Sequence, residues 1–149
     1  MRVLIQRVSE ASVTIEGTVH STIGQGLLLL VGIEHEDTSE DIDWLVKKIT
    51  QMRIFSDDDG KMNLSVQDVN GSLLVISQFT LHASTKKGNR PSYIKAARPE
   101  IAIPLYEQFL TTLSDQNLKI ASGKFGANMK VALVNDGPVT IWLDSRDKQ

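Results

Sequence analysis

Hydrophobic and polar residues at the start of the chain follow the short period that is typical of β-strands. The segments RVLIQRV and ASVTIEG combine β-branched residues with this alternation, and GTVHSTIG continues as a short strand that ends at Gly24 and Gly26. Two apolar runs predict strands that are buried on both faces, GLLLLVGI from Gly26 and GSLLVISQFTL from Gly71. This pattern favours a protein built mainly from β-strands.

The period changes to that of a helix in the segment DTSEDIDWLVKKITQ. Four apolar residues recur there at i, i+3, i+4 and i+7 and form one helical face, namely Ile42, Leu45, Val46 and Ile49. Thr38 and Asp41 have the spacing of a capping box, which predicts where the helix begins.

A second helix is predicted in EIAIPLYEQFLTTL, because its apolar residues keep the same spacing. These residues are Tyr106, Phe109, Leu110 and Leu113. Pro104 is expected to lie near the first turn of this helix or to kink it, since proline lacks a backbone N–H.

Two short polar segments predict turns. In DDDGKMN, an acid cluster at 57–59 precedes Gly60, but a calcium loop is excluded because its first and last ligands would be Phe55 and Val66. The better interpretation is a hairpin with its Asp-Gly pair at the tip. In NDGPVT, the pair Gly137–Pro138 lies between two strand-like segments and predicts a second turn. The elements together predict an α+β domain.

Composition limits both the class of protein and the kinds of site. A length of 149 residues suits one domain, residues 1–149. The chain has no cysteine, which excludes disulfides, thiolate nucleophiles and zinc–thiolate sites. The opening MRVLIQRVSE does not have the apolar stretch of a signal peptide, and no apolar run approaches the ~20 residues of a membrane helix. We therefore expect a soluble, cytoplasmic protein.

Charge is distributed unevenly along the chain. The net charge of −2 gives no global basic field for nucleic acid. The segment KKGNRPSYIKAAR nevertheless has no acidic residue and holds five basic ones, Lys86, Lys87, Arg90, Lys95 and Arg98. Two interpretations are open, a solvated loop and a segment that contacts phosphates.

The three histidines do not predict a metal site, and no cofactor is expected. None of them is spaced from another histidine or a carboxylate as metal ligands usually are. We expect His20 and His35 on the surface. Thr80 and His82 would face each other only if a regular strand continued past Ser77, and then His82 could activate a nucleophile. No G-x-S-x-G elbow surrounds Ser77.

Four motifs together resemble those of the D-aminoacyl-tRNA deacylase family. They are the opening IQRV-x-x-ASV, the polar strand end SQFTL, the basic segment KGNRPSY and the late NDGPVT. The turn RIFSDDDGKMN and the strand GLLLLVG fit as well, so the resemblance covers essentially the whole chain. It implies a fold with a mostly antiparallel, barrel-like β core and two main helices. It also implies hydrolysis of the ester between a D-amino acid and the terminal ribose of tRNA.

The resemblance further implies an active site that is shared between two subunits of a homodimer. One subunit would supply the pocket for the terminal adenosine and the ester, with residues Ser77, Gln78, Phe79 and Thr80. The backbone N–H of Phe79 would face the ester carbonyl. The other subunit would supply Gly137 and Pro138, which are joined by a cis peptide bond, hold the amino group and reject L-amino acids. Arg7 would support that pair.

Chemistry leaves several alternatives open. An aminoacyl ester is already activated, so positioning and an oxyanion donor supply much of the rate. The resemblance implies that the substrate 2′-hydroxyl assists the attacking water, and Thr80 as a nucleophile is the second interpretation. Exclusion of L-amino acids by steric clash would admit glycyl-tRNA, because glycine has no side chain.

Lys86, Lys87 and Arg90 are expected to contact acceptor-stem phosphates. The rival functions are a non-catalytic nucleic-acid-binding module and a serine/threonine hydrolase that uses His82.

Overall fold

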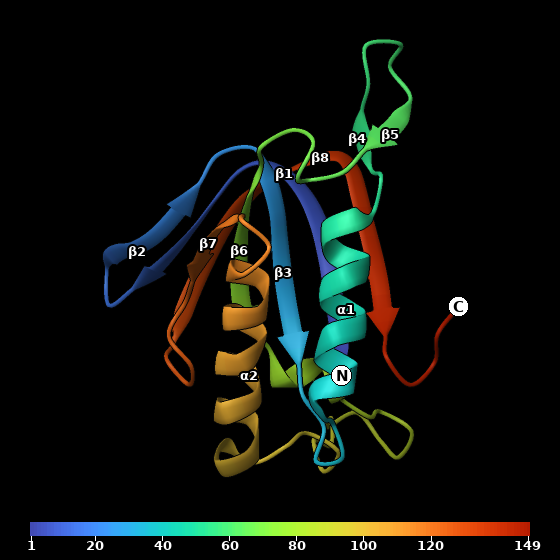
Figure 1. Cartoon of the computed structure of the whole chain (residues 1–149). Helices are drawn as coiled ribbons and strands as arrows, with labels where there is room; N and C mark the ends of the chain where they lie inside the picture. The colour runs from blue at the N-terminus through green and yellow to red at the C-terminus, as the bar shows by residue number, and fades with distance from the viewer.

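The computed structural model describes residues 1–149, and its main feature is a strongly curved mixed sheet (Figure 1). Its strands are β1 (Arg2–Ile15), β2 (Thr18–Ile23), β3 (Gly26–Gly32), β6 (Ser72–Ser77), β7 (Lys119–Ser122) and β8 (Met129–Asp144). The order is β2-β1-β3-β6-β7, and β8 pairs with the other edge of β1. Every neighbour of β1 is antiparallel to it, whereas β3, β6 and β7 run parallel. The Ser21 hydroxyl donates to the Ser122 carbonyl at 2.7 Å, which draws β2 toward β7 and nearly closes a barrel.

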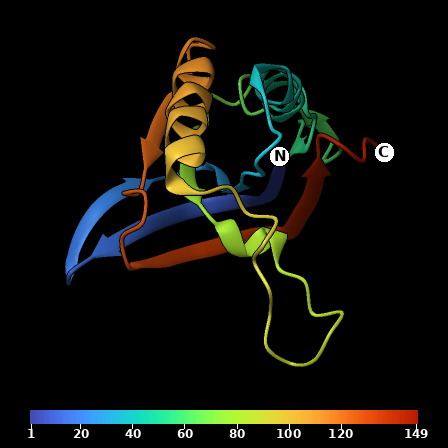
Figure 2. The same ribbon diagram turned by 90° about the horizontal axis from the view of Figure 1, so that it is seen from below.

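Two helices cover one face of the sheet (Figures 1 and 2). Helix α1 (Ser39–Gln51) begins at the predicted capping box, where the backbone N–H of Thr38 donates to Asp41 Oδ2 at 2.8 Å. The predicted apolar face of α1 is buried. Helix α2 (Pro99–Ser114) has Pro99 in its first turn and Pro104 further inside. Neither helix is long and apolar enough to cross a membrane.

The core forms two layers, one on each face of β3 and β6. Their odd-numbered residues pack under the helices, namely Leu27, Leu29, Val31, Leu73 and Val75. Their even-numbered residues pack inside the curved sheet, namely Leu28, Leu74 and Ile76. Both apolar runs therefore form strands that are buried on both faces, as predicted. The α+β class, the mostly antiparallel barrel-like core and the two main helices are likewise confirmed.

The predicted hairpin is present as β4 (Phe55–Ser56) and β5 (Met62–Leu64). Gly60 has a φ of 75°, a conformation that glycine adopts without steric cost. The Asp57 carboxylate accepts hydrogen bonds from the backbone N–H groups of Asp59 and Lys61 at 3.0 and 2.9 Å. The first residue of the acid cluster, Asp57, thus stabilises this turn.

Two predictions about local structure are wrong. The pair Gly137–Pro138 does not turn the chain, because β8 continues through it as one strand along β1. The register of this pairing shifts between Gln6 and Val8 and again between Val8 and Glu10, so the pair lies in a bulge rather than a turn. The strand that was predicted to continue through SQFTL ends at Ser77 as β6, and a 3₁₀ helix, η1 (Phe79–His82), follows it.

Candidate functional site

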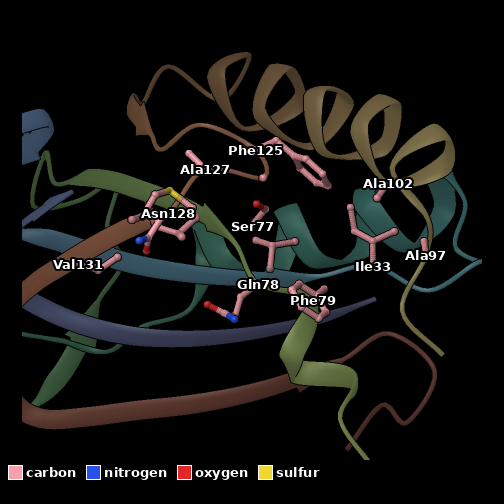
Figure 3. Close-up of a pocket in the computed structure, with 14 residues that line it drawn as sticks. Ile33, Ser77, Gln78, Phe79, Ala97, Ala102, Phe125, Ala127, Asn128 and Val131 are labelled. Atoms are coloured by element: carbon pink, nitrogen blue, oxygen red, sulfur yellow. The ribbon is translucent and has the colours of Figure 1, made fainter. Parts of the chain in front are cut away.

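A cavity of about 320 Å³ opens where β6 ends and η1 begins (Figure 3). Three of the predicted site residues line it, namely Ser77, Gln78 and Phe79. Most of the remaining surface is apolar and comes from distant parts of the chain, including Ile33, Ala97, Ala102, Phe125, Ala127, Met129 and Val131. A cavity of this size and lining is suited to a flat apolar group beside a few polar contacts.

The parallel pairing of β6 with β3 ends at the cavity, and the chain leaves the sheet there. The backbone N–H of Gln78 donates to the Val31 carbonyl at 2.7 Å, and η1 then carries the chain away from β3. The Phe79 side chain is 56% exposed, and its ring meets Tyr93 edge-on with the centroids 5.0 Å apart. These two aromatic rings stand beside the entrance to the cavity.

Thr80 and His82 do not form a nucleophile–base pair. Two residues that are two apart in a 3₁₀ helix lie about 120° from each other around its axis, so the regular strand that the pairing requires is absent. Thr80 does not line the cavity, and its Oγ1 accepts a hydrogen bond from Gln78 Nε2. His82 is 2% exposed, and its Nδ1 lies 3.1 Å from Glu34 Oε1.

The other two histidines, His20 and His35, are exposed, as expected. No group of three or more His, Cys, Asp or Glu side chains is arranged to hold a metal ion.

The second set of predicted residues lies on β8, outside the cavity. The peptide bond between Gly137 and Pro138 is cis, and both residues are exposed. Gly137 has a φ of 115°, and a Cβ added there would lie 2.7 Å from Arg7 Nη2. Arg7 is 8% exposed, and its Nε donates to the Asp136 carbonyl at 3.2 Å while its Nη1 donates to the Ile54 carbonyl. Arg7 therefore packs directly against this segment.

Two further side chains of the NDGPVT motif fasten the bulge, although they were not among the predicted site residues. The Asn135 amide Nδ2 donates to the carbonyls of Arg7 and Val139 at 3.1 and 3.0 Å. Thr140 Oγ1 donates to the Pro138 carbonyl at 3.2 Å. The motif thus contains both the exposed pair and the groups that hold its backbone. Asn135 and Thr140 are the first and last residues of the motif, and this position is the only indication of their role in the sequence.

The far wall of the cavity was not predicted. It is the loop 123–128, which the parallel pairing of β6 with β7 brings close to η1. The Tyr106 hydroxyl donates to the Val75 carbonyl at 2.9 Å, and its ring contacts Phe125 with centroids 5.9 Å apart. Burial raises the pKa of Tyr106 far above its usual range, so its hydroxyl stays a neutral donor that holds α2 and Phe125 in place.

The predicted RNA-contacting residues lie on a separate, protruding loop (Figure 2). Lys86, Lys87 and Arg90 are exposed. The loop is closed by reciprocal backbone hydrogen bonds of 2.8 and 2.9 Å between Ser84 and Ser92. Its chain then passes Tyr93, so the loop begins and ends beside the mouth of the cavity.

Comparison with known proteins identifies the family of the chain. The sequence profile of the family described as D-Tyr-tRNA(Tyr) deacylase matches residues 4–144. The chain is 63% identical to proteins named D-aminoacyl-tRNA deacylase from Flavobacterium johnsoniae and Bacteroides thetaiotaomicron, with 100% of each chain covered.

Two solved structures extend the comparison. One, described as c-Myc DNA Unwinding Element Binding Protein, has a TM-score of 0.91 at 43% identity and covers 97% of this chain and 98% of its own. Another, described as a probable eukaryotic D-amino acid tRNA deacylase, has a TM-score of 0.79 at 16% identity, covers 95% of this chain and 97% of its own, and shows the same fold. On the profile match and the full-length identity, the chain belongs to the D-Tyr-tRNA(Tyr) deacylase family.

Proposed function

We propose that this protein hydrolyses the ester bond of D-aminoacyl-tRNA and releases the free D-amino acid and the tRNA. Its similarity to deacylases over the full length supports this reaction. The observation that carries the proposal is the cavity, in which apolar walls suited to a nucleobase adjoin the polar residues Ser77 and Gln78. The terminal adenosine occupies the apolar part, and the ester lies at the start of η1. The reaction takes place in the cytoplasm, where charged tRNA is used.

Catalysis in this proposal relies on positioning and on the substrate. The first backbone N–H groups of a helix have no acceptor within it, so the N–H of Phe79 is available to the oxyanion that forms at the ester carbon. The substrate 2′-hydroxyl assists the attacking water. Thr80 is a poor candidate for the nucleophile, because its Oγ1 already accepts an N–H from Gln78 and no base contacts it.

The site requires a second copy of the chain. Gly137 and Pro138 do not line the cavity of their own subunit, and they project from an exposed strand. The strand β8 also exposes the large apolar side chains of Val134, before the bulge, and Trp142, after it, at 50% and 47%, which favours burial of this strand against a partner. A two-fold homodimer would present each bulge to the other subunit's cavity.

The bulge selects by exclusion. The carbonyls of Gly137 and Pro138 hold the substrate ammonium, while the N–H of Phe79 holds the ester carbonyl. With both groups fixed, a D side chain points out of the site and an L side chain meets the backbone of the bulge. A thousandfold preference needs only ~4 kcal/mol, which one forced overlap supplies. Glycine has no side chain to exclude, so glycyl-tRNA is a side substrate.

A second candidate function is nucleic-acid binding without catalysis. The 43% identical structure is described as a DNA-element-binding protein, and the exposed Lys86, Lys87 and Arg90 suit phosphate contact. Single-turnover hydrolysis of matched D-alanyl-, L-alanyl- and glycyl-tRNA separates the two functions. We expect fast hydrolysis of the D-alanyl and glycyl forms and at least ~1,000-fold slower hydrolysis of the L-alanyl form. Binding without hydrolysis would support the second candidate, and glycyl-tRNA as resistant as L-alanyl-tRNA would contradict exclusion.

A further inference from the structure

A second, more polar groove of about 660 Å³ adjoins the cavity. One side is the end of β1 and the turn that follows it, residues 14–17. The other side is the loop 124–128 together with Lys130 at the start of β8. Lys130 lies opposite Thr14 in the antiparallel pairing of these strands, so the two sides of the groove meet at the sheet.

The groove and the cavity share a wall. Phe125, Gly126, Ala127 and Asn128 line both of them. Figure 3 shows Ala127 and Asn128 at one end of the cavity and Ala97 and Ala102 at the other. A chain-like ligand whose terminal group fills the cavity can therefore continue past Ala127 and Asn128 into the groove.

The groove has the chemistry of a phosphate site. Its charged residues are Lys124, Lys130 and Glu16, which give an excess of one positive charge on a chain with a net charge of −2. Both lysines are exposed and free to reach a ligand. Thr14 and Asn128 add a hydroxyl and an amide, which are common phosphate partners beside lysine.

We infer that this groove binds the phosphates of the unpaired nucleotides that precede the terminal adenosine of the substrate. The inference rests on the proposed function, which puts that adenosine in the adjoining cavity. It gives the protein two separate RNA contacts. The groove takes the single-stranded 3′ end, and the protruding loop with Lys86, Lys87 and Arg90 is left for the stem.

The test compares Lys124→Gln/Lys130→Gln with a control pair, Lys61→Gln/Lys47→Gln, which removes the same charge from exposed sites outside the groove and the cavity. For the groove pair we expect kcat/KM on D-tyrosyl-tRNA to fall about tenfold at low salt, because two phosphate contacts are lost. The rate on D-tyrosyl-adenosine, which carries no phosphate, should not change. The salt dependence of binding to uncharged tRNA should become shallower by about 0.7 for each single-strand phosphate contact removed.

Two results would overturn the inference. One is a groove pair that matches the control pair in its salt dependence. The other is an equal loss on D-tyrosyl-adenosine, which would mean that the substitutions had damaged the cavity. The binding measurement needs no hydrolysis, so the groove is tested separately from the proposed reaction. A wild-type protein that binds tRNA but hydrolyses neither substrate would contradict the proposed function alone.

Discussion

The cavity at the end of β6 and the bulge of β8 are built in opposite ways. The cavity is concave and mostly apolar, and its walls come from segments far apart in the sequence. The bulge is exposed, and it comes from a single short motif whose backbone is tied by the side chains of Arg7, Asn135 and Thr140. A cavity recognises a group by enclosing it. On the proposed function, the bulge excludes an L side chain and therefore has to be rigid, and the hydrogen bonds that converge on these few residues supply such rigidity.

The largest effect on the rate is expected from removing the 2′-hydroxyl of the substrate rather than from replacing Thr80. A D-tyrosyl-tRNA that ends in 2′-deoxyadenosine should be cleaved about 1,000-fold more slowly, because the hydroxyl that assists water is missing. Thr80→Ala should lose less than about tenfold, since Thr80 Oγ1 contacts Gln78 rather than the cavity. Single-turnover rates measure both effects. Equal cleavage of the ribo and deoxy substrates, together with inactivity of Thr80→Ala, would restore Thr80 as the nucleophile.

The next effect concerns the bulge. Gly137→Ala should slow hydrolysis of D-tyrosyl-tRNA about 100-fold, because a displaced bulge no longer positions the amino group. The added Cβ would lie 2.7 Å from Arg7 Nη2, and the φ of 115° disfavours any L residue. Gly24→Ala is a matched control, since a Cβ there meets nothing within 4 Å. A wild-type rate in Gly137→Ala would show that the rigidity of the bulge is unimportant.

The smallest effect is expected outside both regions. Replacing Lys86, Lys87 and Arg90 together by Gln should weaken tRNA binding about tenfold at low salt and flatten its salt dependence, equally for different tRNA species. Stopped-flow binding at several salt concentrations measures this. The single-turnover rate at saturating substrate should stay unchanged, because these residues lie on a loop outside the cavity. An unchanged salt dependence would leave this segment as a solvated loop.

Much of the fold could be predicted from the sequence, because local patterns determine it. The face of α1, its capping box and the strands with two buried faces each leave a periodic signal. Gly137–Pro138 was wrongly predicted to be a turn, since a Gly-Pro pair between strands usually reverses the chain. Here β1 pairs with β8 on both sides of the pair, and Asn135 bridges the carbonyls of Arg7 and Val139, so the strand continues.

Only part of the candidate site could be predicted from the sequence. SQFTL and NDGPVT are compact motifs, and the residues predicted from them do line the cavity or form the bulge, with Thr80 as the exception. The opposite wall left no signal, because Phe125 and Asn128 reach the cavity only through the pairing of β6 with β7. The short helix η1 was also missed, since four residues are too few to show a period.

The most direct test of the central claim, that one subunit's bulge completes the other subunit's cavity, is complementation between two inactive variants. Ala127→Trp fills the cavity and leaves the bulge intact. Gly137→Ala distorts the bulge and leaves the cavity intact. Each variant alone should be nearly inactive on D-tyrosyl-tRNA. Heterodimers purified through two different tags contain one native pairing of cavity and bulge, so we expect about half of the wild-type rate per dimer. Purified heterodimers as inactive as either parent would contradict the claim, and the site would then have to form within one chain.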